Sequence, residues 1–206
     1  MANKDAPFGL KPVKHLNGMS WNGQTVRFYI SANDGSDTFI GDPVIITATA
    51  ADREANGKCL TVEKATAGDG NFITGVVTSF EPEDSTSLKY RASGTARYGT
   101  MVIDPSVIYH IQDDGGIAST DLWPGANAVL IFTHSGSAYT GLSGVELDSG
   151  STTAPSADAS NQLTILQLAD IPGNALGANA IWEVMINLHS FRSTGDGDGS
   201  LGIIGA

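Results

Sequence analysis

The sequence predicts an all-β protein, folded as a single β-barrel or β-sandwich-like domain with an extended N-terminal arm and a long loop rich in Ser, Gly and Thr. The main reason is that apolar and polar residues alternate with a period of two in several segments, as half-buried strands require. Asn-Gly and Asp-Gly pairs, which suit tight turns, separate these segments. No stretch shows the pattern of a long amphipathic helix.

The strand pattern recurs along most of the chain. Val26, Phe28 and Ile30 alternate with polar neighbours, and Trp182 opens a similar alternation near the C-terminus. Asp104-Pro105 is a turn signal between two apolar runs, which are therefore expected to pair as a hairpin. The predicted strands cover residues 25–30, 43–49, 72–80, 97–103, 106–111, 128–133 and 180–189. A short helical turn is expected near residues 119–123.

A chain of 206 residues suits one domain, or one domain with an insertion. We expect an extended arm over residues 1–24, a β-rich body over 25–192 and a flexible glycine-rich tail over 193–206. Within the body, residues 134–160 consist mainly of Ser, Gly, Thr and Ala, which supply little apolar material for a core. This part is expected to form a surface excursion between strands.

The start of the chain is basic, whereas the rest is acidic. In residues 1–30, Lys4, Lys11, Lys14 and Arg27 stand against Asp5 alone, which gives a charge of about +3. Because the whole chain carries −11, the remaining residues carry about −14. The N-terminal arm is therefore the part of the chain that differs most in charge from the body.

The arm also carries apolar residues and prolines that cannot form a core of their own. Residues 6–13 read Ala-Pro-Phe-Gly-Leu-Lys-Pro-Val. We expect the arm to pack on a partner surface through apolar anchors and positive charges. The candidate contact residues are Lys4, Phe8, Leu10, Lys11, Val13 and Lys14. Trp21, beside a turn, either anchors the arm to the body or faces a partner, and the first interpretation is favoured.

Composition excludes several classes of function. An isoelectric point near 4.5 disfavours nucleic-acid binding, because phosphate contacts need clustered Lys and Arg. The single cysteine, Cys59, excludes an intrachain disulfide and is expected to be a half-buried strand residue. The sequence shows neither the apolar region of a secretory signal nor an apolar run long enough to span a bilayer. We expect a soluble protein that folds in a cytoplasm and binds no membrane.

The sequence contains no catalytic motif for phosphate binding, acyl transfer or zinc hydrolysis. Its four histidines are too scattered for a zinc site, and Asp113-Asp114 precedes two glycines, as in a solvated turn. Asp196 and Asp198 alternate with glycine as in a calcium loop, but a loop starting there would run past the last residue, so a flexible acidic tail is favoured. We expect no enzyme activity, no cofactor and no metal.

Several motifs together resemble small structural proteins of tailed bacteriophages. The first motif is the opening MANKDAPFGLKPVKHLNG, residues 1–18. A strand at residues 25–30, FIGDPV at 39–44, the run at 104–112 and the closing run at 186–192 continue the likeness over most of the chain. Members of this group look like capsid decoration (cement) proteins, which are β-rich and sit on the outside of the phage head.

This resemblance implies a virion structural protein that stabilises contacts between subunits of the major capsid protein. It implies a homo-oligomer, with a trimer favoured, that is made in the host cytoplasm and located on the capsid exterior. In this interpretation Phe8, Leu10 and Val13 are buried in grooves between capsid subunits, while the lysines of the arm meet carboxylates on the shell.

Two other functions stay open. A tail-associated or surface carbohydrate-binding module would share the β-rich, acidic composition and the Ser/Gly/Thr-rich excursion, although the sequence shows no cluster of aromatic residues with Asp, Asn or Arg. A hydrolase using scattered Asp and His is the third possibility, and no constellation of residues supports it.

Overall fold

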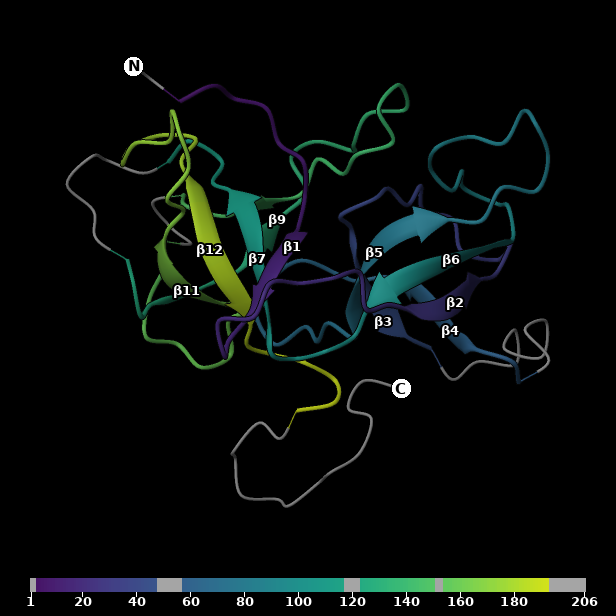
Figure 1. The fold of residues 1–206 in the computed structure, drawn as a ribbon, viewed down its shortest axis with the longest axis horizontal. Helices are drawn as coiled ribbons and strands as arrows, with labels where there is room; N and C mark the ends of the chain where they lie inside the picture. Colours follow the sequence, from purple (N-terminus) through teal and green to yellow (C-terminus); the bar gives the residue numbers. More distant parts are fainter. Residues whose placement is uncertain (1–2, 48–56, 117–122, 151–153, 193–206) are drawn as a thin grey trace.

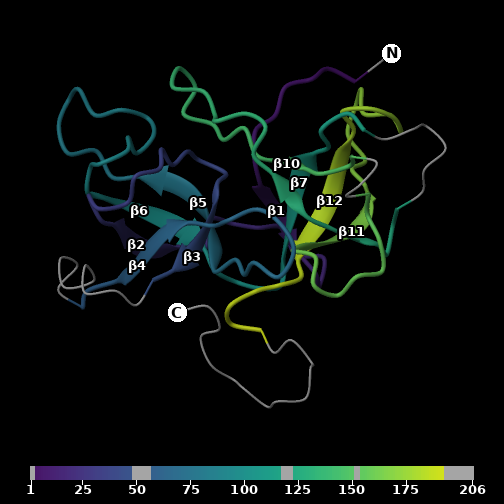
Figure 2. The ribbon, with the colours of Figure 1, turned by 180° about the vertical axis from the view of Figure 1, so that it is seen from behind.

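The computed structural model describes residues 3–47, 57–116, 123–150 and 154–192. Within these residues the chain forms twelve β-strands and no helix, which confirms the predicted all-β class. Figure 1 shows the strands gathered into two neighbouring bodies, a barrel and a sheet. The N-terminal segment runs down along the sheet to the junction between them (Figures 1 and 2).

Five strands from the first half of the chain close into a barrel. They are β2 (Val26–Ile30), β3 (Pro43–Ile46), β4 (Leu60–Lys64), β5 (Gly75–Phe80) and β6 (Arg97–Val102), in the order β2-β4-β3-β5-β6. β2 and β4 are parallel, whereas the other neighbours are antiparallel. Side chains from all five strands fill the interior: Phe28, Ile30, Val44, Val62, Val77 and Met101.

The second body is a five-stranded antiparallel sheet with a small two-stranded sheet beside it. The large sheet has the order β1-β7-β12-β11-β8, and β9 pairs with β10 in the small one. Their bounds are β1 (Lys11–His15), β7 (Val107–Gln112), β8 (Asn127–Ala128), β9 (Leu130–Ile131), β10 (Glu146–Leu147), β11 (Leu163–Leu168) and β12 (Ile181–Ile186).

The barrel is an insertion in the sheet. The chain enters the sheet at β1, builds the barrel, and returns to pair β7 with β1. One apolar core joins the two bodies, because Val76 and Val102 of the barrel strands belong to the same buried cluster as Tyr109 and Trp182 of the sheet. A substitution that disturbs this shared core in one body is therefore expected to destabilise the other body as well.

The predicted hairpin around Asp104-Pro105 is wrong, although both of its strands exist. β6 pairs with β2 and β5 in the barrel, whereas β7 pairs with β1 and β12 in the sheet. A turn signal specifies that the chain reverses or bends, but not which strand becomes the neighbour. Here the turn carries the chain from the barrel to the sheet.

Strands occur at each of the other predicted positions, and four strands were not anticipated. β1 contains Pro12, which is tolerated because β1 lies at the edge of its sheet. β4 and β11 show an apolar alternation that could have been recognised, in Leu60–Lys64 and Leu163–Leu168. β10 has only two residues. The expected helical turn at 119–123 falls almost entirely outside the described residues, and so does the tail at 193–206.

The segment 134–160 departs from the expected surface excursion. Residues 143–149 are buried, and Val145 and Leu147 belong to the main core. Glycine permits this close packing, because a side chain at Gly144 would collide with His134: its Cβ would lie 2.6 Å from the Cβ of His134. Residues 137–140 remain exposed, as predicted, and Tyr139 is 87% exposed.

Candidate interaction surface

The N-terminal segment is held on the protein's own body. Asn3 Nδ2 donates hydrogen bonds to the carbonyls of Ala175 (2.8 Å) and Ala178 (3.0 Å). Gln112 accepts a hydrogen bond from the Ala6 amide at 2.9 Å and donates to the Lys4 carbonyl at 2.8 Å. Regular structure begins before residue 25, because β1 (Lys11–His15) lies within the segment expected to be an extended arm and pairs with β7.

The segment crosses the barrel at a point where two glycine backbones touch. Gly9 has a φ of +77°, and a Cβ placed there would lie 2.6 Å from the Cβ of Ser143 and 2.7 Å from the carbonyl oxygen of Gly41. The next amide, that of Leu10, donates to the same Gly41 carbonyl at 2.9 Å. Only glycine fits at this crossing, which explains why residue 9, where the N-terminal segment meets the barrel, is a glycine.

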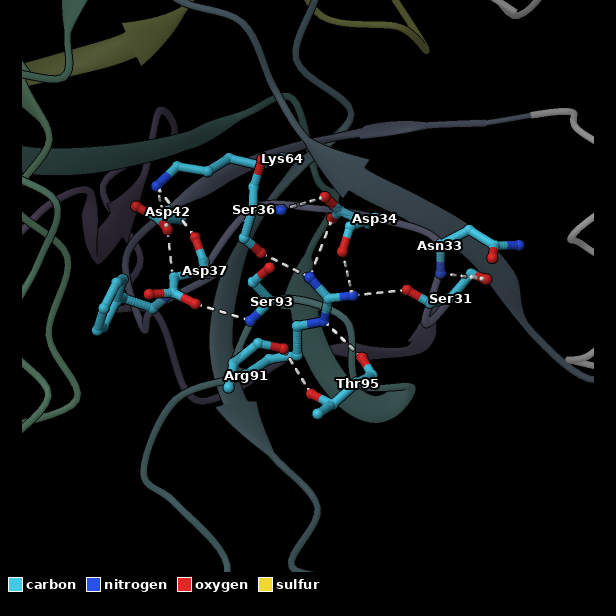
Figure 3. A network of polar contacts seen from close by, with 12 residues as sticks. Ser31, Asn33, Asp34, Ser36, Asp37, Asp42, Lys64, Arg91, Ser93 and Thr95 are labelled. Atoms are coloured by element: carbon cyan, nitrogen blue, oxygen red, sulfur yellow. Dashed lines mark hydrogen bonds and ion pairs between the residues drawn. The ribbon is translucent and has the colours of Figure 1, made fainter.

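Asp42 organises the barrel side of the crossing. Its carboxylate accepts hydrogen bonds from Ser143 Oγ (2.5 Å) and from the Phe39 amide (2.8 Å), and pairs with Lys64 Nζ at 2.9 Å. Burial raises the pKa of Asp42, an effect opposed by the positive charge of Lys64 and by these hydrogen bonds. Figure 3 shows Lys64 reaching this carboxylate. Hydrogen bonds and an ion pair of Asp42 therefore hold the backbone in place where the N-terminal segment crosses the barrel.

A second polar network fixes the loop between β2 and β3. The fully buried guanidinium of Arg91 donates to the carbonyls of Ser31 (2.6 Å), Ser36 (2.6 Å), Asp34 (2.8 Å) and Thr95 (2.7 Å). Figure 3 shows these groups arranged around the side chain. Burial lowers the pKa of Arg91, and the negative charge of Asp34 opposes this shift. The network is structural, because the guanidinium N–H groups of Arg91 donate to backbone carbonyls of the protein itself.

The six predicted contact residues fall into two groups. Leu10 is 1% exposed and packs in the protein's own core, so its side chain presents almost no surface to a partner. Lys14 pairs with Glu183 at 2.7 Å, while Val13 and Phe8 are half-buried. Lys4 and Lys11 are exposed and make no ion pair with a described residue. The predicted surface is therefore reduced to two lysines and the visible parts of Phe8 and Val13.

An apolar groove lies between the N-terminal segment and the barrel. It has a volume of about 480 Å³ and is lined by Phe8, Trp21, Ile40 and Leu142, with Lys11 and His110 as its basic lining residues. A smaller pocket of about 280 Å³ adjoins it, shares Phe8, and is lined by Lys4. No acidic side chain lines either cavity among the described residues. The groove was invisible in the sequence, because its walls come from remote segments.

Trp21 anchors the segment to the body, as favoured from the sequence. Its ring packs against the main core, and its amide donates to the Val13 carbonyl at 3.2 Å. The indole N–H is buried and has no hydrogen-bond partner among the described residues. The same ring forms part of the groove wall.

The turn that follows β1 carries exposed apolar side chains that sequence reasoning missed. Leu16 is 57% exposed and Met19 is 60% exposed. The turn is nevertheless well held, because the His15 amide donates to the Met19 carbonyl at 2.8 Å and the Leu16 amide donates to that of Ser106 at 2.8 Å. The available signal was a Leu and a Met flanking Asn17-Gly18, a turn pair that displays its neighbours to solvent.

The remaining candidate residues do not form a reactive site. Asp113 is fully buried rather than solvated, and accepts hydrogen bonds from the Gly115 amide (2.9 Å) and from Trp182 Nε1 (3.2 Å). Burial raises its pKa. Cys59 is half-buried just before β4, and burial also raises the pKa of its thiol. Within the described ranges, no three His, Cys, Asp or Glu side chains are placed to hold a metal ion.

The part of the chain that the structure describes contains no helix able to cross a bilayer.

Comparison with known proteins adds no assignment. No protein family matches the chain, and neither a curated protein nor a solved structure matches it at a significant level.

Proposed function

We propose that this protein is a virion structural protein that binds the outer surface of a tailed-phage capsid and stabilises contacts between major capsid protein subunits. The observation that carries the proposal is the hydrogen-bonded turn after β1, with Leu16 57% exposed and Met19 60% exposed. The sequence resemblance supports the same role, as does the basic character of residues 1–30 in an otherwise acidic chain. The protein acts as a homo-oligomer, with a trimer favoured, after synthesis in the host cytoplasm.

The physical basis is burial of preorganised apolar surface. Complete burial of a fully exposed Leu or Met side chain contributes about 1.5–3 kcal/mol, so the exposed parts of Leu16 and Met19 contribute a fraction of that each, and many copies on one shell add their contacts. The turn loses little entropy on binding because its backbone is already hydrogen-bonded at His15 and Leu16. The exposed Lys4 and Lys11 attract an acidic shell and raise the association rate.

Deleting residues 1–24 is not a clean test, because it removes β1 and the buried Leu10. The sharper test is the double variant Leu16→Asp with Met19→Asp, whose side chains face solvent. We expect it to fold normally, by circular dichroism and thermal melting, and to lose binding to purified phage heads that lack this chain. Co-sedimentation and cryo-electron microscopy of the heads measure occupancy.

Ser135→Asp is the matched control, because it adds a negative charge at an exposed position outside the turn, the groove and the 82–88 loop. It should decorate heads as the wild type does. Full occupancy by the double variant would refute the proposed contact, and a wild-type protein that does not bind heads at all would refute the proposed function.

Glycan binding is a second candidate function, favoured by one observation. A pocket of about 620 Å³ beside β9 brings Phe132 together with Asp69, Asp148 and Asn161. An aromatic ring next to acceptors for sugar hydroxyls is the combination that the sequence did not reveal. A glycan array tests it: a hit that is lost in Phe132→Ala would favour this function, and an array without hits would remove it.

A further inference from the structure

The apolar groove beside β1 and the long loop between β5 and β6 have complementary chemistry. The groove is lined by Phe8, Trp21 and Leu142 and by the exposed Lys11, which makes no ion pair with a described residue. The loop displays Leu88, which is 49% exposed, close in sequence to the exposed Glu83 and Asp84. One chain therefore contains both an apolar cavity with a positive rim and an apolar tip with negative neighbours.

We propose that the groove binds the 82–88 loop of a second copy of this chain, with Leu88 inserted beside Phe8 and Leu142 and with Glu83 facing Lys11. This inference rests on the homo-oligomer of the proposed function and names the surfaces through which two copies meet, which are separate from the turn at Leu16 and Met19. The groove volume of about 480 Å³ is ample for a leucine and its neighbours.

The loop is preorganised for such a contact. Ser87 Oγ accepts hydrogen bonds from the amides of Glu83 (2.8 Å) and Asp84 (3.0 Å), and Asp84 Oδ1 accepts one from the Thr86 amide at 2.8 Å. These bonds hold the loop in one shape, so little conformational entropy is lost when it docks. The Glu83 carboxylate makes no hydrogen bond with a described residue and no ion pair within 4.0 Å, and its described cationic neighbour is Arg97, whose pKa is lowered by burial and raised by the negative charge of Glu83.

Charge explains why the occupant is a second copy. The groove is lined by Lys11, its adjoining pocket by Lys4, and neither by an acidic described residue, whereas the chain as a whole carries −11. The positively charged groove of one copy attracts the negatively charged loop of the next copy and repels the groove of that copy. In Figures 1 and 2 the loop lies at the outer end of the barrel and β1 at its inner end.

A contact between two different surfaces is heterologous, so each copy offers one groove and one loop. Repetition of such a contact produces a closed ring when the rotation between copies closes, and an open chain when it does not. A contact of this type, unlike an isologous one, is restored when two differently defective variants are mixed. That property supplies the test.

Analytical ultracentrifugation of the full chain, without capsids, measures the association. We expect wild-type protein to self-associate, and we expect Leu88→Asp in the loop and Leu142→Asp at the groove each to weaken association at least about tenfold. Mixed in equal amounts, the two variants should form a one-to-one dimer, because one intact groove and one intact loop remain. Lys11→Glu should also weaken association, and adding Glu83→Lys in the same chain should restore it.

Leu16→Asp is the control that separates this inference from the proposed function, because it alters the turn and leaves the groove and loop intact. It should lose head binding while self-association is unchanged. A wild-type chain that stays monomeric at several hundred micromolar would overturn the inference, and so would variants that are not rescued by mixing. Loss of head binding by Leu142→Asp with normal self-association would assign the groove to the capsid instead.

Discussion

The barrel and the sheet bury polar groups in different ways. The barrel forms from one continuous stretch of chain, and its interior cluster is entirely apolar, from Phe28 to Met101. The sheet joins four separate stretches, β1, β7, β8 and β11–β12, and buries Gln112, Asp113 and Glu183. A body assembled from remote segments leaves backbone groups at its joints without strand partners, and polar side chains supply the missing hydrogen bonds.

The largest expected effect concerns Arg91, one of several polar side chains that the barrel and its loops bury outside the apolar interior cluster, together with Thr38, Asp42 and Arg97. Arg91→Met keeps the length of the side chain but leaves four buried or partly buried carbonyls, in loop 31–36 and at Thr95, without their donor. We expect a loss of about 3–5 kcal/mol in the free energy of unfolding. Urea denaturation measures it. A loss below about 1 kcal/mol would mean that water replaces the guanidinium and that the barrel does not depend on this network.

The next effect concerns a joint of the sheet. Gln162 is fully buried, donates to the carbonyls of Thr66 and Asn71, and accepts from the amides of Gly68 and Leu130. Gln162→Leu is expected to cost about 2–4 kcal/mol, because it leaves buried backbone groups unpaired. Hydrogen exchange should show earlier opening of residues 66–71. Equal protection there in both proteins would contradict the role of Gln162 as a joint.

The pH dependence should also originate at the junction. Burial lowers the pKa of His189 from 6.5 to about 4, and its Nδ1 accepts a hydrogen bond from the Phe191 amide. Because the folded state binds this proton less readily than the unfolded state, the contribution is complete above pH 6.5 and is lost as the pH falls towards 4. The loss amounts to about 3 kcal/mol at most.

His189→Gln is the variant that isolates this contribution, since other groups titrate in the same range. Denaturation at pH 7 and at pH 4.5 should show a smaller loss of stability for the variant than for the wild type. Parallel pH profiles for the two proteins would show that His189 does not carry the effect.

The smallest effect compares ion pairs on the two bodies. Lys14 pairs with the buried Glu183 on the sheet, whereas Arg27 and Glu81 are both more than 40% exposed on the barrel. Lys14→Met should cost about 1 kcal/mol, because Glu183 keeps Gln167 as a hydrogen-bond donor but loses its counter-charge. Arg27→Met, the matched control, should leave stability unchanged within the error of denaturation. A larger effect at Arg27 would reverse the comparison.

Local pattern was enough to place most strands. The alternation at residues 25–30 and 180–189 appears in the structure as β2 and β12, because a half-buried strand needs apolar residues at every second position. β11 shows the same pattern and was recognisable. β1 was not, because Lys11 and Pro12 are poor strand formers that an edge position tolerates. The candidate contact residues were chosen for charge and apolarity, which say nothing about the surface on which they pack.

Strand pairing and the fate of the N-terminal segment depend on contacts far apart in the chain. Backbone hydrogen bonds are alike for any neighbour, so the turn at Asp104-Pro105 could not reveal that β6 and β7 belong to different bodies. The basic, apolar composition of residues 1–30 was readable from the chain alone. Leu10 is buried in the protein's own core, whereas Leu16 and Met19 face solvent. This arrangement depends on the contact of Gly9 with Gly41 and on the hydrogen bonds to Gln112, which exist only once the body has folded.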